Sequence, residues 1–141
     1  MSYDIELCDP VSHETLLLDT PHQMAGGMYA LGGTQEMWLN VTYNYAGWYY
    51  KAGVFAETSE DSKGIRTIYG LTGADSIPVL RKAIAALEAM TGEYVDEDAR
   101  ERCEKQGVTG YWLPTRQNAI RRLYQLLALA QMRPDGIWEG D

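Results

Sequence analysis

The sequence predicts a segregated α+β fold, in which an N-terminal antiparallel β-hairpin or small sheet packs against three to four helices. Alternating apolar and polar residues, which are typical of strands, are concentrated before residue 45, and apolar residues at helical spacing follow it. The chain has 141 residues, of which 45% are hydrophobic, and shows no internal repeat or linker. We therefore expect a single domain over residues 1–141.

Residues 3–19 predict the β-hairpin. Apolar and polar side chains alternate over residues 3–8, residues 9–13 have the composition of a turn, and residues 14–19 return as a short apolar run. The apolar positions that share one face of the first strand are Tyr3, Ile5 and Leu7.

A glycine-rich segment follows the hairpin. Glycine pairs at residues 26–27 and 32–33 mark turns or close approaches to the backbone, and residues 28–31 between them predict a brief strand. The spacing of these glycines matches neither a P-loop nor a dinucleotide fingerprint, and no lysine follows. We therefore expect no phosphate site in this segment.

Residues 37–45 alternate with a period of two and are rich in β-branched and aromatic residues, which predicts a strand. We prefer a strand that passes directly into a helix at Asn44, which would cap a helix over residues 45–53. The alternative is one continuous helix over residues 34–52, because Thr34 is followed by helix-compatible residues.

Helices dominate the second half of the chain. Residues 56–64 are polar and predict a mobile loop, and residues 65–69 predict a short strand or extended segment. A helix then begins near Ser76, which can cap it, with Pro78 in its first turn, and ends at Gly92. Its apolar stripe comprises Ile77, Leu80, Ile84, Leu87 and Met90.

Two further helices complete the prediction. Residues 95–106 predict a charged helix, and we expect a last helix that is capped by Thr115 and stopped by residues 133–136. Trp138 lies in an acidic tail and predicts that this tail docks on the core. The apolar faces of the two helices are Val95, Ala99 and Cys103 in the first, and Ile120, Leu123, Leu127 and Ala130 in the second.

Charge is distributed unevenly along the chain. The net charge is −8, and the first basic side chain is Lys51, so residues 1–50 contain acidic but no basic side chains. Binding to a phosphate backbone needs clustered Lys and Arg, so we expect no direct contact with nucleic acid or anionic membranes. A negative field favours basic protein surfaces, including the nucleic-acid grooves of other proteins.

The sequence also bears on compartment and assembly. No apolar run approaches the ~20 residues of a membrane-spanning helix, and the N-terminus lacks both a basic start and an apolar signal core. Two cysteines are too few for a disulfide scaffold. We expect a soluble cytoplasmic protein. The sequence is compatible with a homo-oligomer and does not define the oligomeric state.

Several segments resemble a loose set of small proteins encoded by bacteria, phages and other mobile elements. They are the Asn-Val-Thr-Tyr-Asn stretch at residues 40–44, the segments 64–66 and 69–70, the hairpin strand 3–7 and the proline-containing helix 76–90. These proteins have no established activity. The resemblance implies an accessory protein that binds and blocks host machinery, and it carries over no catalytic residues.

No constellation of residues predicts catalysis. Cys8 has acidic strand neighbours that oppose thiolate formation, and Cys103 lies on the thin apolar face of a charged helix. His13 is in a turn, and His22 follows a proline in a polar loop. The acidic run 96–98 fits a solvated helix start and not a calcium loop, so we expect no enzyme activity, metal or cofactor.

Most candidate binding residues lie between residues 38 and 50. Alternation places carboxamides, a hydroxyl and an aromatic ring on one face of the predicted strand, which suits recognition of a ligand better than reaction with it. Three adjacent aromatics in the following helix cannot all be buried on one stripe, so some should be exposed. The candidates are Trp38, Asn40, Thr42, Asn44, Trp48, Tyr49 and Tyr50, together with His22.

Two functional hypotheses follow from these features. The first is a small acidic binding protein, a phage or mobile-element accessory protein, that inhibits a basic, nucleic-acid-handling host protein. The alternative is a binder of a small molecule or nucleotide signal, built from the polar strand face and the glycine-rich segment. Structural roles in strand pairing and helix capping remain an alternative for the polar face.

Overall fold

The structure is a computed structural model, and it describes residues 1–24, 32–51, 53–55 and 63–141. Its strands are β1 (Ser2–Cys8), β2 (Leu17–His22), β3 (Thr34–Glu36), β4 (Trp38–Thr42) and β5 (Ile137–Gly140). Its α-helices are α1 (Ala46–Tyr49), α2 (Gly73–Ala89), α3 (Glu97–Gln106) and α4 (Arg116–Met132). Short 3₁₀ helices are η1 (Tyr43–Tyr45), η2 (Gly64–Ile68) and η3 (Gly110–Trp112).

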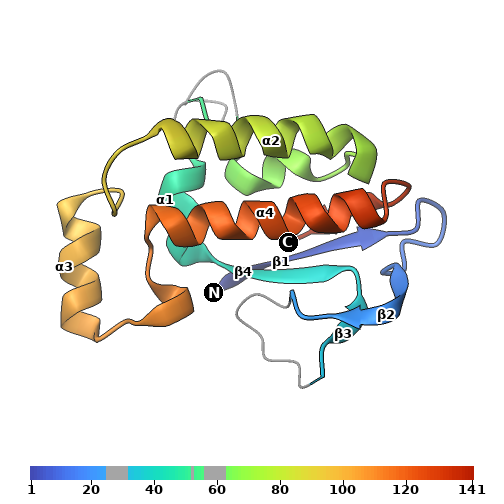
Figure 1. Cartoon of the computed structure of the whole chain (residues 1–141), viewed down its shortest axis with the longest axis horizontal. Helices are drawn as coiled ribbons and strands as arrows, with labels where there is room; N and C mark the ends of the chain where they lie inside the picture. The colour runs from blue at the N-terminus through green and yellow to red at the C-terminus, as the bar shows by residue number, and fades with distance from the viewer. Residues whose placement is uncertain (25–31, 52, 56–62) are drawn as a thin grey trace.

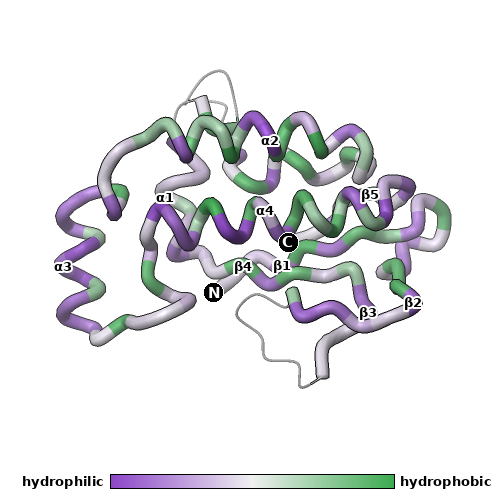
Figure 2. Tube along the Cα trace, viewed as in Figure 1, coloured by the Kyte–Doolittle hydropathy of each residue, from purple (hydrophilic) through white to green (hydrophobic). Residues whose placement is uncertain are grey.

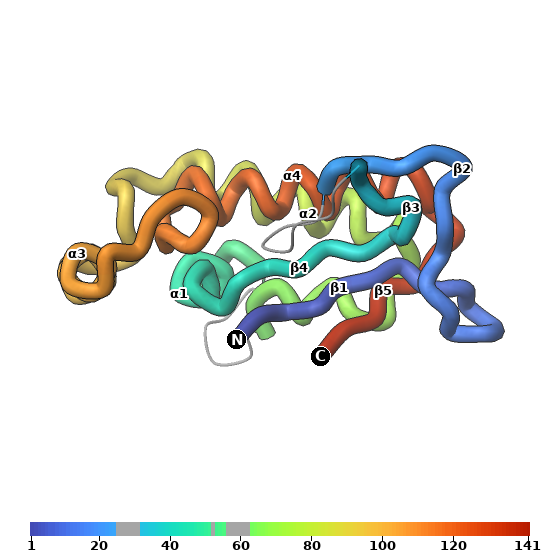
Figure 3. The backbone as a smooth tube through the Cα atoms, turned by 90° about the horizontal axis from the view of Figure 1, so that it is seen from below, coloured from blue at the N-terminus to red at the C-terminus, as the bar shows by residue number. Residues whose placement is uncertain are grey.

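Helices and strands form two layers, which confirms the predicted α+β class. The long helices α2 and α4 pack against each other and lie above the strands in Figure 1. Strands β4, β1 and β5 form an antiparallel sheet in that order, and β2 pairs with β3 in a second, two-stranded sheet. Seen from below, the strands β4, β1 and β5 run side by side (Figure 3). In the described ranges, no helix has the length and apolar character needed to span a membrane.

The predicted hairpin over residues 3–19 forms at its turn, but its two arms do not pair along their length. Around a bridge between Cys8 and Thr15, the Asp9 amide donates to the Glu14 carbonyl and the Leu16 amide donates to the Leu7 carbonyl, each at 2.8 Å. The rest of β1 pairs with β4 and β5.

Most positions of β2 are exposed, including Leu17, and Leu18 packs against the core while only partly buried. β4 and β5 contribute the fully buried Leu39, Val41 and Trp138, and these strands take the places beside β1.

The transition from strand to helix near Asn44 is confirmed, and the continuous helix over residues 34–52 is wrong. The capping residue is Thr42, whose Oγ1 accepts a hydrogen bond from the Asn44 amide. Asn44 instead donates from its side chain to the carbonyl of Trp112. The turn is 3₁₀ at first, and α1 ends at Tyr49, earlier than predicted.

The predicted strand over residues 65–69 is a 3₁₀ helix. Gly64 adopts a left-handed φ of 56°, and Ile65 and Ile68, three residues apart, are both buried, which is the spacing of a 3₁₀ turn. The predicted strand at residues 28–31 and most of the predicted loop at residues 56–64 lie outside the described residues.

Helix α2 begins three residues earlier than predicted. Thr72 is the cap and accepts from the Asp75 amide, so Pro78 lies beyond the first turn. A side chain on Gly73 would collide with the Arg133 carbonyl at 2.7 Å, which explains why glycine starts this helix. The predicted charged helix is confirmed as α3, and the predicted last helix is confirmed as α4 with its cap Thr115.

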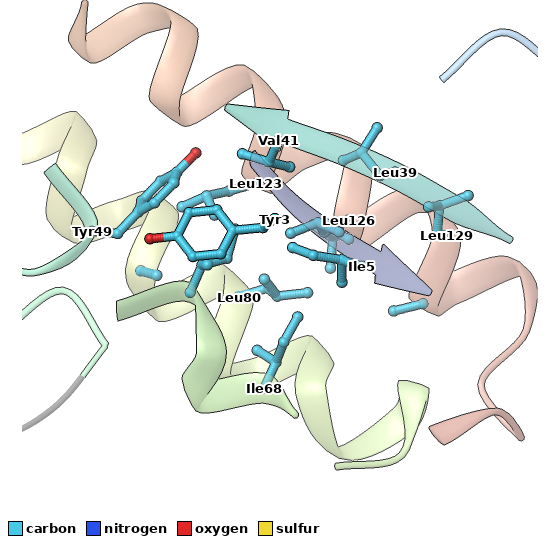
Figure 4. Packing of buried hydrophobic residues seen from close by; sticks show 14 of the residues in the cluster. Tyr3, Ile5, Leu39, Val41, Tyr49, Ile68, Leu80, Leu123, Leu126 and Leu129 are labelled. Atoms are coloured by element: carbon cyan, nitrogen blue, oxygen red, sulfur yellow. The ribbon is translucent and has the colours of Figure 1, made fainter. Parts of the chain in front are cut away.

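The core lies between the sheet and the two long helices. Figure 4 shows inward side chains of β1 and β4 meeting side chains of α2, α4 and η2. The labelled residues are Tyr3, Ile5, Leu39, Val41, Tyr49, Ile68, Leu80, Leu123, Leu126 and Leu129. Trp138 is fully buried, which confirms that the tail docks on the core.

Ser76 and Trp138 join the C-terminal strand to helix α2. The Ser76 hydroxyl donates to the Gly73 carbonyl at 2.7 Å and accepts from the Trp138 indole nitrogen at 2.7 Å. All of Ser76 and Trp138 is inaccessible to water. An indole N–H left without an acceptor here would keep the full cost of its desolvation.

We expect Ser76→Ala to lower the free energy of unfolding by about 1–3 kcal/mol, because it removes that acceptor. Urea unfolding at neutral pH measures the change. Thr109→Ala is the control, since Thr109 is exposed and its side chain caps no helix. Equal stability of the Ser76 variant and the wild-type protein would contradict this role.

Candidate functional site

The outer face of the three-stranded sheet gathers carboxylates from both ends of the chain. Asp4 of β1 lies opposite Asn40 of β4 in the sheet. Glu6 of β1 lies between Trp38 of β4 and Glu139 of β5. Directly paired residues project to the same face, and the inward face belongs to the core. We call this surface the acidic sheet face; it comprises Asp4, Glu6, Trp38, Asn40, Glu139 and Asp141.

None of the three strands contains a lysine or arginine. β1 and β4 precede Lys51, the first basic residue, and β5 has the sequence Ile-Trp-Glu-Gly. Figure 2 shows hydrophobic and hydrophilic residues alternating along β1, which is the alternation expected of a strand with one buried and one outer face. The unequal charge distribution of the sequence thus gathers carboxylates on one face of the sheet. Arg66 reaches the edge of this face, where its Nε donates to the Asp141 backbone carbonyl at 2.8 Å.

Two carboxylates on this face lie directly opposite each other. Glu6 and Glu139 are register partners, an arrangement of like charges that destabilises a sheet. Neighbouring groups offset this repulsion: the Thr15 hydroxyl donates to Glu6, and His13 Nδ1 lies 2.7 Å from Glu139 Oε1. Hydrogen bonds from Cys8 and His13 lower the pKa of Glu139, so its charge is retained.

Cys8 is buried beneath the turn that carries His13. Burial is the main cause that raises the pKa of the Cys8 thiol to about 12, and a hydrogen bond to Glu139 and the charge of Glu6 add to it. The prediction that acidic neighbours oppose thiolate formation is therefore confirmed. Cys103 is buried as well, in keeping with its predicted packing role.

Asn40 and Thr42 are almost fully buried and bonded within the fold. The Asn40 amide donates to Ser2 Oγ at 2.7 Å and to Asp4 Oδ1 at 2.8 Å. The Tyr111 hydroxyl donates to the Asn40 carbonyl and accepts from the Thr42 amide, so it caps the free edge of β4. These contacts hold the acidic sheet face in shape.

The aromatic cluster divides between core and surface. Trp48 and Tyr49 are buried, with their polar atoms donating to the carbonyls of Pro114 and Ala119. Tyr50 is 38% exposed, which confirms that some of the cluster reaches the surface. Trp48 and Tyr49 are therefore inaccessible to a partner in this fold.

Trp112 is an exposed aromatic that the sequence patterns do not single out. It is 52% exposed, more than Tyr50, and lies at the end of η3. The short segment Gly110–Trp112 has no helical or strand periodicity from which exposure could be inferred. Its carbonyl accepts from the Asn44 side chain, so Trp112 is held beside a predicted site residue.

His22 belongs to the second sheet. Its Nδ1 accepts from the Met24 amide at 3.1 Å, so Nε2 carries the proton and donates to the Glu36 carbonyl at 2.6 Å. Gly33 lies so close that a side chain there would meet the His22 carbonyl at 2.6 Å, which confirms the predicted close approach. Both ring nitrogens are therefore engaged: Nε2 joins β2 to Glu36 of β3, and Nδ1 holds the Met24 amide directly after β2.

A pocket of about 280 Å³ lies between the η1–α1 segment and helix α3. Figure 2 shows α3 as a mostly hydrophilic helix, and Figure 1 places it at one end of the molecule. The pocket-lining residues include Tyr43, Asn44, Asp96, Arg102, Cys103 and Gln106. Of the predicted site residues, Asn44 alone lines this pocket.

The side chains on these surfaces are mainly carboxylates, carboxamides and aromatic rings. Within residues 1–24, 32–51, 53–55 and 63–141, no three His, Cys, Asp or Glu side chains are grouped to hold a metal ion. Comparisons with protein-family models, with curated proteins and with solved structures found no match to this chain. The functional argument therefore starts from the geometry and charge of the chain itself.

We expect the free energy of unfolding to fall as pH rises from about 9 toward 12. The unfolded thiol titrates near 8.5, below its folded pKa of about 12, so the unfolded state loses the Cys8 proton first and is favoured at alkaline pH. Tyr3, whose pKa burial raises to about 12, acts in the same direction. Urea unfolding at a series of pH values gives the slope.

Cys8→Ala should make this alkaline fall shallower. Cys103→Ala removes a second buried thiol and shows how much of the change arises from packing alone. The same pH dependence in the wild-type protein and in Cys8→Ala would contradict a role for the Cys8 thiol.

Proposed function

We propose that this protein is a non-enzymatic binding protein whose acidic sheet face docks on a basic surface of a partner protein. The observation that carries the proposal is the array of Asp4, Glu6 and Glu139 on strands that contain no Lys or Arg, with Asp141 directly after β5. Residues two apart on a strand are about 7 Å apart, and neighbouring strands are about 4.8 Å apart. Four carboxylates at these separations can contact several cations of one basic surface together.

Rigidity favours binding by this face. Asp4 is held by the Asn40 amide, Glu139 by His13, and Asp141 accepts from the Asp4 backbone amide at 3.0 Å. Groups already fixed in place lose little conformational entropy when a partner binds. Trp38, half-buried beside Glu6, adds a flat ring against which an arginine can stack.

The class of partner follows from charge complementarity. A surface with dense Lys and Arg is most often one that holds nucleic acid, so we propose a nucleic-acid-handling partner that the protein inhibits by occupying its groove. The resemblance to small phage and mobile-element proteins supports an accessory role of this kind. Inhibition then requires no chemistry from the chain.

A competition assay tests the proposal. A fluorescent DNA duplex is bound to a purified basic DNA-binding domain, and this protein is added while anisotropy is followed. We expect the duplex to be released at low ionic strength and the effect to weaken as salt rises, because exposed charges are screened. No release at any salt concentration would count against the proposal.

A pair of triple variants locates the effect. Asp4→Asn, Glu6→Gln and Glu139→Gln together remove three charges from the acidic sheet face, and the amides keep the acceptors. Glu93→Gln, Asp98→Asn and Glu101→Gln remove three exposed charges elsewhere. We expect at least a tenfold weaker effect from the first triple and a nearly unchanged one from the second. Equal losses would assign the effect to net charge alone.

Small-molecule binding is a second candidate function, supported by the pocket that Asn44 lines. A thermal-shift panel of nucleotides tests it, because a ligand at 100 times its dissociation constant adds ~2.7 kcal/mol of stability. Asn44→Ala should reduce any shift, whereas Gln131→Ala, exposed on α4, should not. No shift with any nucleotide would exclude nucleotides as ligands of this pocket.

A further inference from the structure

The pocket between the η1–α1 segment and α3 offers space for a small ligand. Its volume is about 280 Å³, and its two walls lie at the same end of the molecule in Figures 1 and 3. A side chain on Gly47 of α1 would meet Val95 Cγ2 at 3.1 Å, so the walls are in close contact there. Asn44 lies three residues before Gly47 on one wall. Asp96 directly follows Val95 on the other.

Helix α3 lines the pocket with an apolar strip between two opposite charges. The strip consists of Ala99 and Cys103, which are buried and four residues apart. With about 3.6 residues per turn, Asp96 and Arg102 fall on opposite sides of this strip. The wall formed by α3 therefore combines an apolar surface with a carboxylate on one side and a guanidinium on the other.

Arg102 is exposed and makes no ion pair with the residues that the structure describes. Asp98 lies four residues earlier on α3, the spacing at which Arg100 pairs with Glu104. Arg102 lines the pocket and leaves Asp98 unpaired with it. A guanidinium presents parallel N–H donors that match the two oxygens of a carboxylate, so this side of the pocket suits a ligand carboxylate.

Hydrogen-bond acceptors are the second polar feature of the pocket. Asp96 Oδ1 accepts from the Ala99 amide at 2.6 Å, which leaves Oδ2 for another donor. Asn44 Nδ2 donates to the Trp112 carbonyl at 2.8 Å, which leaves Asn44 Oδ1 as an acceptor. An ammonium group has three N–H donors and a positive charge, so it suits both of these oxygens.

We propose that this pocket binds a free amino acid with an apolar side chain, a proposal that rests on the small-molecule function of the pocket given above. The carboxylate of the ligand pairs with Arg102, its ammonium group bonds to Asp96 and Asn44, and its side chain lies on the apolar strip. A volume of about 280 Å³ is below the ~300–1,000 Å³ typical of pockets for drug-sized molecules. Asp96 also repels phosphate groups, so the pocket suits an amino acid better than a nucleotide.

Calorimetric titration of the protein with L-leucine at constant ionic strength tests the proposal. Two derivatives isolate the charges of the ligand: N-acetyl-L-leucine lacks the ammonium group, and L-leucinamide lacks the carboxylate. We expect saturable binding of L-leucine and at least tenfold weaker binding of each derivative. Equal binding of L-leucinamide would overturn the pairing with Arg102, and equal binding of N-acetyl-L-leucine would overturn the role of Asp96.

Two pairs of variants with exposed side chains on α3 locate the ligand. Arg102→Gln removes the guanidinium, and Lys105→Gln removes a cation that lies outside the pocket lining. Asp96→Asn removes a charge but keeps a good cap for α3, and Asp98→Asn, also outside the lining, is its control. We expect at least tenfold weaker binding of L-leucine from Arg102→Gln and from Asp96→Asn, and unchanged binding from both controls. Equal losses within each pair would overturn this placement of the ligand.

The absence of saturable L-leucine binding to the wild-type protein would overturn the proposal, and this readout does not depend on how a variant folds. The nucleotide panel then decides separately on the small-molecule function. A nucleotide shift that Asn44→Ala reduces would preserve that function with a different class of ligand. The basic partner of the acidic sheet face plays no part in either measurement.

Discussion

Strand β1 pairs on both sides, and the remaining structure depends on that double pairing. β4 covers one edge and β5 the other, so the sheet forms only when residues near both ends of the chain meet. Inward, Tyr3, Ile5 and Leu7 give the helices α2 and α4 a surface to pack on. Outward, the same strand fixes Asp4 and Glu6 beside the acidic C-terminal residues. Core and candidate binding surface are therefore two faces of one strand.

The buried bond between Trp138 and Ser76 extends this constraint to the helical layer. It ties β5 to the first turns of α2, and the β5 backbone also bonds to residues just before that helix, where Trp138 accepts from Gly70 and donates to Leu71. A polar atom inside an apolar core specifies one arrangement, because any other leaves a donor unpaired. The tail is thus held in register, which places Glu139 opposite Glu6.

The sequence predicts what depends on neighbouring residues and misses what depends on distant ones. Thr115 is correctly predicted as a cap because a cap is defined within one turn. Ser76 is a comparable candidate cap, but Thr72 accepts from the Asp75 amide and caps the helix, so Ser76 lies inside it. The bond from Trp138 to the Ser76 hydroxyl spans the chain and could not be predicted from neighbouring residues. The partners of β1 could not be predicted, since strand pairing spans the whole chain. For the site, Trp38 and Asn40 lie on the acidic sheet face, but the contribution of the C-terminal strand required the topology.

Charged side chains are distributed unequally between the sheet and the helices. The strands of the main sheet carry carboxylates without Lys or Arg. In the helical layer, Arg81 and Lys82 are exposed on α2 together with Asp75 and Glu88, and Arg121 is exposed on α4. A molecule with uniform charge would meet a basic surface in any orientation. In the proposed binding mode, the acidic sheet face is the side of the molecule that a basic surface attracts before contact. The composition sets the net charge of the protein, and the fold determines on which face the carboxylates lie.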